Sequence, residues 1–523
     1  MGKTEWETYF HYKPSEVSPV DMTEMNVVDN SEVALANILD SQGYCVYFVV
    51  ANYIQRNNHL NSFTLNGNVI RKTIPINNTR QREDGPVNNW ESENITSKRP
   101  DYINLVRHRA KYFYQDLKSH STYNLLRRKR FSLGIAEVGH LPSGFAIFYE
   151  LRIRNTIAIS ATPARPPFYH FLGLPIPVEV PEYYTAQPGD GFADSQIRLI
   201  GSQRLNENIE ELGNIINNYQ QIYGDEFFQQ NSLPPLWQIF ANVRYFLINH
   251  PQIVAYPRHI NNKIGFIGGI AIDQENLEMF RSKVLNTGAI EPVLDDEYSF
   301  LNDSNCIAVV SFGTTISFFG LSQNQLVSIF NAFRQHQNCN FVFRADAFIR
   351  NYVNNNVELP DNVHLFYRRI YLKGILAQRN TKLAVIHCGQ NSLNEALFAG
   401  VPVVCLPFSG DQRYNASVVE YLRLGMWVRA PNLENEFQNA VNALLDEERG
   451  FLPRAQQIAW RLHTEYSAEQ NFLNAVQNAI NSNVRFDRSI QLEPFNLFIK
   501  SKFSHYPFYH TLVEMVLCMG VSP

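Results

Sequence analysis

The sequence from Leu383 to Gly425 reads LAVIHCGQNSLNEALFAGVPVVCLPFSGDQRYNASVVEYLRLG. Its order of apolar, glycine and polar residues predicts a strand, a glycine-bearing loop, a helix, a second strand, a polar loop and a second helix. A strand that leads into a helix through such a loop directs backbone N–H groups and the positive end of the helix toward one point. The stretch therefore predicts an α/β fold with an anion-binding point that suits a phosphate group.

Polar residues begin where the first of these strands ends. Leu383 to Ile386 is apolar, as a buried parallel strand should be, and His387 stands at its carboxyl end. Open α/β sheets bind their ligands at that edge. We expect His387 to donate a hydrogen bond to an anion, and Gly389 to let the backbone approach the bound group closely.

The predicted helix opens with Asn391 and Ser392 and carries Glu395 one turn later. Anionic oxygens would face Gly389 to Ser392, which leaves Glu395 to accept hydrogen bonds from hydroxyl groups. After the second strand, the polar loop carries Asp411 and Gln412. These two residues offer a carboxylate acceptor and an amide that both donates and accepts, a combination that sugar hydroxyls require.

Each of these residues also has a purely structural interpretation. His387 could be a hydrogen-bonded core side chain, Ser392 with Glu395 fits an S-x-x-E capping box, and Asp411 could form a turn. The functional interpretation depends on their joint placement, because all of them fall at the carboxyl edge of one sheet.

The stretch resembles the signature of the UDP-glycosyltransferases, the family of the animal glucuronosyl- and glucosyltransferases and their plant counterparts. The matching residues are His387, Gly389, Asn391, Ser392, Glu395, Ala396, Gly400, Val401, Pro402, Pro407, Asp411, Gln412, Asn415 and Ala416. The resemblance implies the GT-B architecture, in which two Rossmann-like, doubly wound α/β lobes face a cleft. It also implies that His387 and the loop from Gly389 to Ser392 hold a diphosphate, Glu395 a ribose, and Asp411 with Gln412 the donor sugar.

The resemblance extends beyond this signature. Cys306 to Thr315 is similar to the first strand of the family's C-terminal lobe and the turn that faces the diphosphate, which implies that Gly313 and Thr314 approach the donor. Ile264 to Ile270 resembles the interdomain element, and Leu133 to Ser160 together with Phe171 to Tyr183 resembles the acceptor half. After Cys306 to Thr315, the stretch Leu321 to Gln335 predicts a helix that opens with a Ser322 and Gln325 capping box.

The activity implied by the resemblance is inverting transfer of a hexosyl or hexuronosyl group from a UDP-sugar to a hydroxyl of a small lipophilic acceptor. The UDP-sugar is then a cosubstrate, and neither a cofactor nor a metal is expected, because no DxD-like carboxylate cluster is evident. One alternative is a non-catalytic nucleotide-sugar-binding protein or partner subunit that lacks the catalytic base. A nucleotide-sugar epimerase on a similar architecture is another, although Asp411 and Gln412 belong to the transferase pattern.

The general base is where the chain departs from the family. Glu137 matches the family's orienting acid, although a solvent-exposed carboxylate at a strand end is the structural alternative. The base is expected near Val28 and Asp29, where there is no histidine. The nearest other histidines are His11, His59 and His140. Loss of a general base typically lowers a rate by ~10²–10⁴.

A second departure concerns the uracil ring. Arg369 stands where the family usually has a tryptophan that stacks on uracil. Leu372 stands where the family has the glutamine that follows this tryptophan. Stacking of a base on an aromatic ring contributes ~1–3 kcal/mol, so its loss would weaken donor binding. Arg369 could stack through its planar guanidinium, or Tyr367 or Tyr371 could take that place.

Size and composition exclude other classes. A chain of 523 residues predicts two or three domains, and a net charge of -4 without a basic stripe gives no footprint for nucleic acid. The six cysteines are scattered without a CxxC pair, so we expect neither a zinc site nor a disulfide framework. Cys388 and Cys405 are expected to be small buried apolar residues.

The remaining pattern predicts helices over 32–42, 102–117 and 145–151, strands over 44–51, 133–137 and 156–160, and a long polar loop over 57–98. Alternating strands and helices predict a parallel sheet covered on both faces. We divide the chain into a divergent segment 1–27, an acceptor-binding lobe 28–257, a linker 258–300, a nucleotide-sugar-binding lobe 301–482, and a tail 483–523 that crosses back to the first lobe. The last helical stretch, 455–480, is expected to close the second lobe.

The resemblance implies residence in the endoplasmic reticulum with membrane association. Residues 1–27 are charged and lack an apolar core, so they do not fit a secretory signal peptide. No stretch reaches the ~20 apolar residues of a membrane-spanning helix. We therefore expect both ends of the sequence to be truncated or divergent relative to the family. The donor sugar, the acceptor and the oligomeric state are left open by these patterns.

Overall fold

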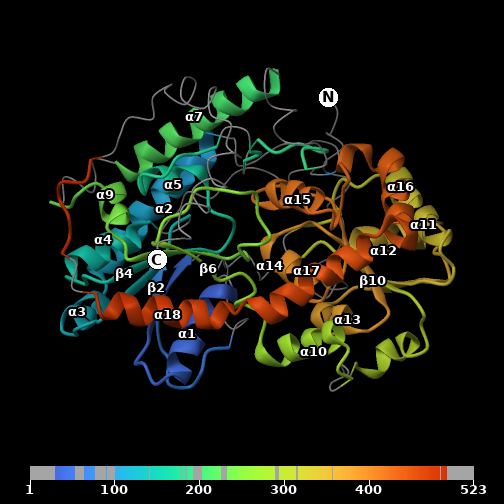
Figure 1. Ribbon diagram of the computed structural model, residues 1–523, viewed down its shortest axis with the longest axis horizontal. Coiled ribbons are helices and arrows are strands. Elements are labelled where there is room, and N and C mark those ends of the chain that lie inside the picture. Colours follow the sequence, from blue (N-terminus) through green and yellow to red (C-terminus); the bar gives the residue numbers. More distant parts are fainter. Residues whose placement is uncertain are drawn as a thin grey trace, which may run out of the picture.

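The computed structural model describes residues 30–53, 64–76, 90, 100–139, 142–177, 180–182, 185–191, 203–224, 232–288, 294–313, 316–355, 357–482 and 485–491. Two α/β lobes lie side by side (Figure 1), each built on a parallel sheet. The predicted α/β class with parallel sheets is confirmed.

The sheet of the N-terminal lobe has four strands in chain order, β3-β4-β5-β6, all parallel. The strands are β3 (Gly134–Glu137), β4 (Thr156–Ser160), β5 (Tyr245–Ile248) and β6 (Ile264–Phe266). Successive side chains of a strand point to opposite faces, so Ala158 and its neighbours Ile157 and Ile159 enter two different cores. The apolar run of β4 is therefore explained by burial on both faces.

Helices cover both faces of this sheet. Ala158 faces a core that contains residues of α2 (Pro100–Ser119), α4 (Ser143–Glu150), α5 (Pro166–Phe171), α7 (Gln203–Tyr223) and α9 (Leu236–Ala241), with α3 (Ser121–Arg127) next to α2. Ile157 and Ile159 face α1 (Asn30–Ser41) and α18 (Ala468–Ile480).

The sheet of the C-terminal lobe has six parallel strands in the order β12-β11-β10-β7-β8-β9. They are β7 (Ile307–Ser311), β8 (Asn340–Arg344), β9 (Val363–Phe366), β10 (Thr381–Ile386), β11 (Val403–Cys405) and β12 (Gly425–Trp427). Counted within the lobe, this is the doubly wound order 3-2-1-4-5-6. The direction of winding reverses between β7 and β10, and open α/β sheets bind ligands at the carboxyl edge of that switch point.

Helices also cover both faces of the second sheet. One core includes α11 (Gln323–Arg334), α12 (Ala347–Asn354) and α16 (Leu433–Leu445), and the other includes α10 (Gln274–Leu285), α13 (Leu372–Ala377), α14 (Gln390–Phe398), α15 (Gln412–Tyr421) and α17 (Phe451–Glu465). Short 3₁₀ helices span Asp296–Leu301, Ala430–Asn432 and Glu447–Arg449. The predicted capping box of α11 is confirmed, because the Ser322 hydroxyl accepts from the Gln325 N–H at 3.1 Å and Gln325 Oε1 accepts from the Ser322 N–H at 2.9 Å.

The chain crosses from the second lobe to the first between α17 and α18. We expected the whole stretch 455–480 to close the second lobe, and this is wrong for α18, which packs on β4, β5 and β6 (Figure 1). Phe472 and Val476 supply its buried face, because they are spaced four residues apart on one side of the helix. Residues 485–491 then lie against the same lobe, where the Asp487 N–H donates to Asn242 Oδ1 at 2.7 Å.

The predicted polar loop over 57–98 is wrong in its middle. Ile70–Ile76 forms β2, which pairs in parallel with β1 (Tyr47–Tyr53) as a separate two-stranded sheet. Ile74 and Ile76 are fully buried, so a short β-branched run inside a polar segment was sufficient to form a strand. Trp90, from the same segment, is also fully buried, and it packs on Phe312, Phe318 and Phe408 of the C-terminal lobe.

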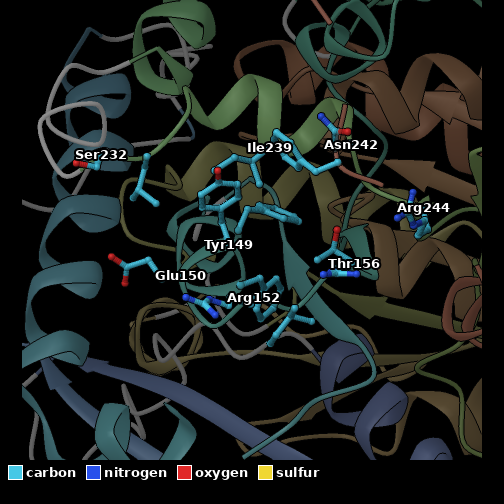
Figure 2. A pocket seen from close by; sticks show the side chains of 14 residues that line it. Tyr149, Glu150, Arg152, Thr156, Ser232, Ile239, Asn242 and Arg244 are labelled. Atoms are coloured by element: carbon cyan, nitrogen blue, oxygen red, sulfur yellow. The ribbon is translucent and has the colours of Figure 1, made fainter. Parts of the chain in front are cut away.

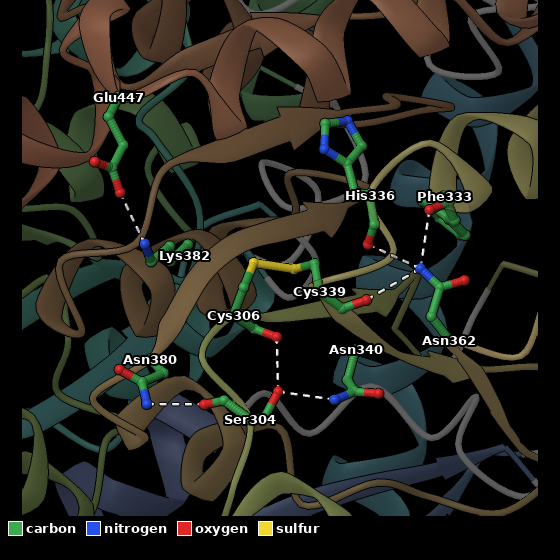
Figure 3. Close-up of a disulfide and its surroundings, with 10 residues drawn as sticks. All are labelled: Ser304, Cys306, Phe333, His336, Cys339, Asn340, Asn362, Asn380, Lys382 and Glu447. Atoms are coloured by element: carbon green, nitrogen blue, oxygen red, sulfur yellow. Dashed lines mark hydrogen bonds and ion pairs between the residues drawn. A yellow bond between two sulfur atoms is a disulfide. The ribbon is translucent and has the colours of Figure 1, made fainter.

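The expectation of no disulfides is also wrong. Cys306 is bonded to Cys339 (Figure 3) with a Cα–Cα distance of 4.4 Å, and Cys388 to Cys405 with a Cα–Cα distance of 5.4 Å. The physical reason is strand register: Ile307 pairs with Asn340 and Ile386 with Cys405, so cysteines that are distant in sequence become neighbours across strands.

Among the residues described, no helix combines the length and the apolar character needed to span a membrane.

Candidate functional site

His387 lies at the switch point of the C-terminal sheet, directly after β10. Its imidazole is held between two backbone turns, those of Gly313 after β7 and Gly389 before α14. A Cβ atom on Gly313 would lie 2.8 Å from His387 Cε1, and one on Gly389 would lie 2.5 Å from Nε2. Both positions therefore require glycine for the ring to occupy this place.

The electrostatic state of His387 follows from its burial. Desolvation lowers the pKa of the imidazole to about 4, so the ring is neutral at pH 7 and keeps one N–H donor. Within the part of the chain that the structure describes, the buried Nδ1 atom has no hydrogen-bond partner. A buried polar atom without a partner is costly in a folded protein, and a bound ligand is one explanation for it.

The helix α14 begins at this ring. Its N-cap is Gly389, which provides no side-chain cap, and the Gln390 N–H donates to Asp411 Oδ2 at 2.8 Å. Because the helix begins three residues earlier than the capping-box interpretation requires, Ser392 and Glu395 do not form such a box. The structural alternative for these two residues is therefore wrong.

Glu395 follows one turn into α14 and is partly exposed. Burial and, to a lesser degree, the carboxylate of Asp273 raise the pKa of Glu395 to about 7, against the lowering effect of Lys373. Lys373 itself is paired with Asp273, with 2.5 Å between Nζ and Oδ2. No side chain in the described ranges makes a hydrogen bond to the Glu395 carboxyl group, so it is available to a ligand's hydroxyl groups.

Asp411 and Gln412 stabilise the loops around this corner. Asp411 Oδ2 accepts from Asn415 Nδ2 at 3.0 Å as well as from Gln390, and Asn415 Nδ2 also donates to the Cys388 carbonyl at 2.9 Å. Gln412 Oε1 accepts from the N–H groups of Phe408 and Ser409 at 2.7 and 2.9 Å. The sequence-predicted residues after β10 and β11 are thus brought together, and the protein itself uses part of their hydrogen-bonding capacity.

Of the remaining residues predicted for the base, its orienting acid and the donor turn, the structure describes only Glu137. Thr314 falls outside the described residues, and so do Val28, Asp29 and the three histidines considered as bases, His11, His59 and His140. Glu137 ends β3 in the N-terminal lobe, where its Oε1 accepts from the Gly139 N–H at 2.7 Å beside the guanidinium of Arg165. This carboxylate is therefore held by its own lobe.

At the position where a residue is expected to stack on uracil, this chain has Arg369 instead of an aromatic residue. Arg369 is exposed. The Tyr371 hydroxyl donates to Asn276 Oδ1 at 2.9 Å, and Arg350 lies over the Tyr367 ring at 4.0 Å from its centroid. Both tyrosines are thus held by neighbouring side chains, so either would have to exchange these contacts for a base.

A cavity of about 430 Å³ in the N-terminal lobe is distinct from this site (Figure 2). Its lining includes Thr156 at the start of β4 and Arg244 just before β5, so it lies at the amino edge of the sheet. The candidate site lies at a carboxyl edge.

The described residues contain no group of three or more His, Cys, Asp or Glu side chains that could hold a metal ion.

Two features of the surroundings were missed from the sequence. Trp90 packs directly on Phe312 and Phe408, which flank the Gly313 turn and the Asp411 loop. Asn249 reaches across from the N-terminal lobe to Asn391, with 3.0 Å between Nδ2 and Oδ1. Neither contact has a local sequence signal, because both join segments more than 140 residues apart.

Comparison with known proteins agrees with this geometry. A family model described as "UDP-glucoronosyl and UDP-glucosyl transferase" matches residues 209–450. A putative UDP-glucuronosyltransferase of Caenorhabditis elegans, ugt-50, is 27% identical over 59% of this chain and 56% of its own length. A second, ugt-46, is 24% identical over 65% of this chain and 61% of its own length. The matches thus cover less than two thirds of these curated relatives.

Solved structures share the fold at low sequence identity. The glycotransferase of kitacinnamycin superimposes with a TM-score of 0.55 at 14% identity, covering 86% of this chain and 95% of that one. Os79 from O. sativa, solved in complex with UDP, gives a TM-score of 0.54 at 15% identity, covering 86% of this chain and 96% of that one. The two-lobe GT-B architecture is therefore confirmed.

Proposed function

Because this chain belongs to the UDP-glucuronosyl and UDP-glucosyl transferase family through residues 209–450, we propose that it transfers a hexosyl or hexuronosyl group from a UDP-sugar to a hydroxyl of a small lipophilic acceptor, with inversion. One observation carries the proposal. A neutral histidine, His387, lies at the switch point of a doubly wound sheet, fixed between two glycine turns, with a buried nitrogen that has no partner among the described residues.

The donor half of the reaction requires stabilisation of a departing diphosphate. The N–H of the His387 imidazole and the backbone at the start of α14 supply hydrogen-bond donors to phosphate oxygens, and the positive end of the helix favours negative charge there. As the bond between the anomeric carbon and the diphosphate oxygen breaks, charge grows on that oxygen. Donors already in position stabilise this charge without reorganisation.

Glu395 is suited to the ribose of the nucleotide. A carboxylate accepts from two neighbouring hydroxyl groups, and its position one turn along α14 separates it from the phosphate-facing end of the helix. Asp411 and Gln412 are proposed to contact the donor sugar with the capacity that their structural hydrogen bonds leave. Within the described ranges, no residue accepts from Gln412 Nε2, so this amide group is the clearest candidate for a sugar hydroxyl.

In the acceptor half, a base must remove the proton of the acceptor hydroxyl as its oxygen attacks the anomeric carbon from the side opposite the diphosphate. Glu137 is proposed to orient that base. A second candidate function, binding of a nucleotide-sugar without catalysis, is favoured by one specific observation: residues 28 and 29, where the base is expected, are Val and Asp.

We further propose a lumenal location in the endoplasmic reticulum. Two disulfides in the C-terminal lobe support it, because disulfides persist in oxidising compartments and are rare in the cytosol. Membrane association stays a prediction from the family resemblance.

The test is an assay of the purified protein with UDP-glucose and UDP-glucuronate, in the presence of a chelator and a panel of lipophilic phenols and alcohols. UDP release together with a glycosylated product of inverted configuration supports the transferase. UDP binding without turnover supports the non-catalytic alternative. Absence of UDP binding at millimolar concentration contradicts both.

A further inference from the structure

The cavity at the amino edge of the N-terminal sheet combines an apolar lining with arginine side chains (Figure 2). Its volume of about 430 Å³ lies within the ~300–1,000 Å³ of sites that bind small molecules. Half of its 14 lining residues are aromatic or aliphatic, among them Phe148, Tyr149, Leu233, Ile239 and Phe486. This part of the lining suits a hydrocarbon chain or an aryl group.

The charged residues of the lining are predominantly cationic. Arg152, Arg154 and Arg244 line the cavity together with one carboxylate, that of Glu150. The Glu150 carboxylate already accepts from Lys118 Nζ at 2.7 Å and from two tyrosine hydroxyls at 2.6 and 2.8 Å. Its charge is therefore balanced by a lysine that does not line the cavity, and the three arginines leave an excess of positive charge.

This positive charge is not offset by nearby carboxylates. Within the described ranges, neither Arg152 nor Arg154 forms an ion pair. Burial and the positive charge of Arg244 lower the pKa of Lys263, whose Nζ donates to the Ala241 carbonyl at 2.7 Å. Repulsion between these two cations is a cost that an anion bound nearby would reduce.

The turn that carries Arg152 is one where glycine is the usual residue. At the end of α4 the Arg152 N–H donates to the Tyr149 carbonyl at 3.1 Å and the Ile153 N–H donates to the Phe148 carbonyl at 2.9 Å. This is a Schellman motif, and Arg152 occupies its left-handed position with φ of 59°. That conformation is unfavourable for a residue with a Cβ atom. A role for the side chain in the cavity explains why an arginine is found there.

The segment 485–491 contributes one wall of the cavity. The Phe486 ring meets the Tyr149 ring edge-on, with 5.3 Å between their centroids. The next residue, Asp487, exchanges two backbone hydrogen bonds with the Asn242 side chain, at 2.7 and 3.0 Å. These contacts hold Phe486 in the lining, so the apolar part of the cavity is built by segments that are distant in sequence.

We propose that this cavity binds a small amphipathic anion, with its apolar body against Tyr149 and Phe486 and its carboxylate or phosphate-ester head group at Arg152 and Arg154. A guanidinium donates two parallel hydrogen bonds to either head group. The apolar lining separates such a ligand from an inorganic anion. The cavity lies in the N-terminal lobe and the UDP site is proposed at the carboxyl edge of the C-terminal sheet, so this proposal does not depend on the proposed function.

Calorimetric titration of the full chain with octanoate, octyl phosphate and octanol tests the proposal. At least one of the two anions should bind at submillimolar concentration, and the tighter of them identifies the head group. Octanol has the same chain without the charge, so it should bind at least about 5-fold more weakly than the tighter anion. Binding of neither anion at millimolar concentration, or octanol binding as tightly as the anions, would overturn the proposal.

A double variant tests the place of the head group. Arg152→Gln with Arg154→Gln should weaken the tighter anion at least about 5-fold and leave octanol within about 2-fold. Arg128→Gln with Arg130→Gln is the matched control, because these arginines are exposed in the same lobe, do not line the cavity, and change the net charge equally. Equal losses in the two double variants would overturn the proposal, since only the overall charge would then matter.

Two single variants complete the test. Phe486→Ala removes part of the apolar wall, so it should weaken octanoate and octanol alike, by about 3-fold or more. Arg152→Gly suits the left-handed turn, so it should fold at least as stably as the unsubstituted protein while it binds the anion more weakly. It carries the test if the double variant does not fold, and unchanged anion affinity in Arg152→Gly would contradict the proposal.

UDP titrations distinguish this proposal from the proposed function. All of these variants should keep UDP affinity within about 2-fold of the unsubstituted protein, because none of the substituted residues lies near His387 or α14. A loss of UDP affinity as large as the loss of anion affinity would overturn the assignment of a separate site. If the unsubstituted protein binds octanoate but not UDP, the proposed function fails and the amphipathic-anion site stands.

Discussion

The two sheets of this molecule differ at the edge where ligands bind. In the C-terminal lobe the winding reverses between β7 and β10, and His387, Gly313 and the start of α14 meet at that point. In the N-terminal lobe the described strands run in chain order without a reversal, and Glu137 is held by Gly139 beside Arg165. The difference teaches that the strand order of the C-terminal sheet brings hydrogen-bond donors together at one point. In the N-terminal lobe, reactive side chains have to be placed by loops instead.

The lobes are also unequal in how they are held together. Both disulfides belong to the C-terminal lobe. Trp90, from the N-terminal half of the sequence, packs in the core of this C-terminal lobe. The largest predicted effect concerns this contact. Trp90→Ala should lower the free energy of unfolding by about 3–5 kcal/mol, because it leaves a cavity between Phe312, Phe318 and Phe408.

Urea unfolding of Trp90→Ala measures this loss. Trp460→Ala is the matched control: Trp460 is 49% exposed, so its substitution should change stability by less than about 0.5 kcal/mol. Equal effects of the two substitutions would show that Trp90 does not belong to the core of the C-terminal lobe.

The second prediction concerns Cys306 and Cys339. Replacing both with alanine should cost about 2–4 kcal/mol, the usual range for a disulfide that closes a loop of this length, here with a sequence separation of 33. Hydrogen exchange should accelerate in β7 and β8 and stay unchanged in β3 to β5. Cys45→Ala, at an exposed free cysteine, should have no effect. Uniform acceleration across both lobes would contradict the idea that this bond stabilises one lobe.

The third prediction compares two histidines of the same lobe. His387→Ala should weaken UDP about 10- to 150-fold, the loss expected when a charged group loses a hydrogen bond of about 1.5–3 kcal/mol. His364→Ala should leave UDP affinity unchanged, since His364 stacks on Phe300 and contacts Asn340, away from α14. Calorimetric titration gives both values, and a similar loss in the two variants would show that His387 has no special contact with UDP.

The fourth prediction is a dependence on pH. The pKa of Glu395 is raised to about 7, so lowering the pH from 8 to 6 protonates the carboxylate that is proposed to accept from ribose hydroxyls. Uridine affinity should therefore fall by up to about 10-fold over this range, while Glu395→Gln should show no such change. Uridine is the appropriate ligand because it has no phosphate that titrates.

The same shift affects stability with a defined sign. The folded-state pKa of Glu395 lies above the value in the unfolded chain, so folding favours the protonated form. This contribution is present at low pH and is lost as the pH rises through about 7. Thermal unfolding should thus show the stability gain of Glu395→Gln over the unsubstituted protein growing from pH 5 to pH 8, and a constant difference would argue against the shift.

The smallest effect is expected in the N-terminal lobe. Glu137→Ala should change UDP affinity by less than about 2-fold, because Glu137 lies at the end of β3 in the N-terminal lobe, where its Oε1 accepts from the Gly139 N–H of the same lobe. Any glycosyl transfer should fall much more than UDP affinity does, which kinetic assays with a fixed acceptor would measure. A large loss of UDP affinity would show that the two lobes do not divide donor and acceptor as proposed.

The sequence predicted the elements of the C-terminal lobe around His387 well because their signals are local. Leu383 to Ile386 falls within β10, and the helix and loop that follow come where the pattern of apolar and glycine residues predicted. Thr156–Ser160 likewise matches a predicted strand, since an apolar run of that length bounded by polar residues has few alternatives.

What failed depends on contacts that span the chain. Both disulfides follow from strand register, α18 is placed by an apolar stripe that fits the N-terminal sheet, and Asn249 meets Asn391 only after the lobes have docked. Spacing along the sequence carries none of this information. The capping-box interpretation of Ser392 and Glu395 failed for a local reason, because Gly389 rather than Ser392 begins the helix.

The most direct measurement is a crystal structure of the protein with UDP and without added metal. The account predicts diphosphate oxygens within about 3 Å of a ring nitrogen of His387 and of the donors at the start of α14, with the ribose at Glu395. Diphosphate bound elsewhere, for instance in the arginine-lined cavity at the amino edge of the N-terminal sheet, would contradict it.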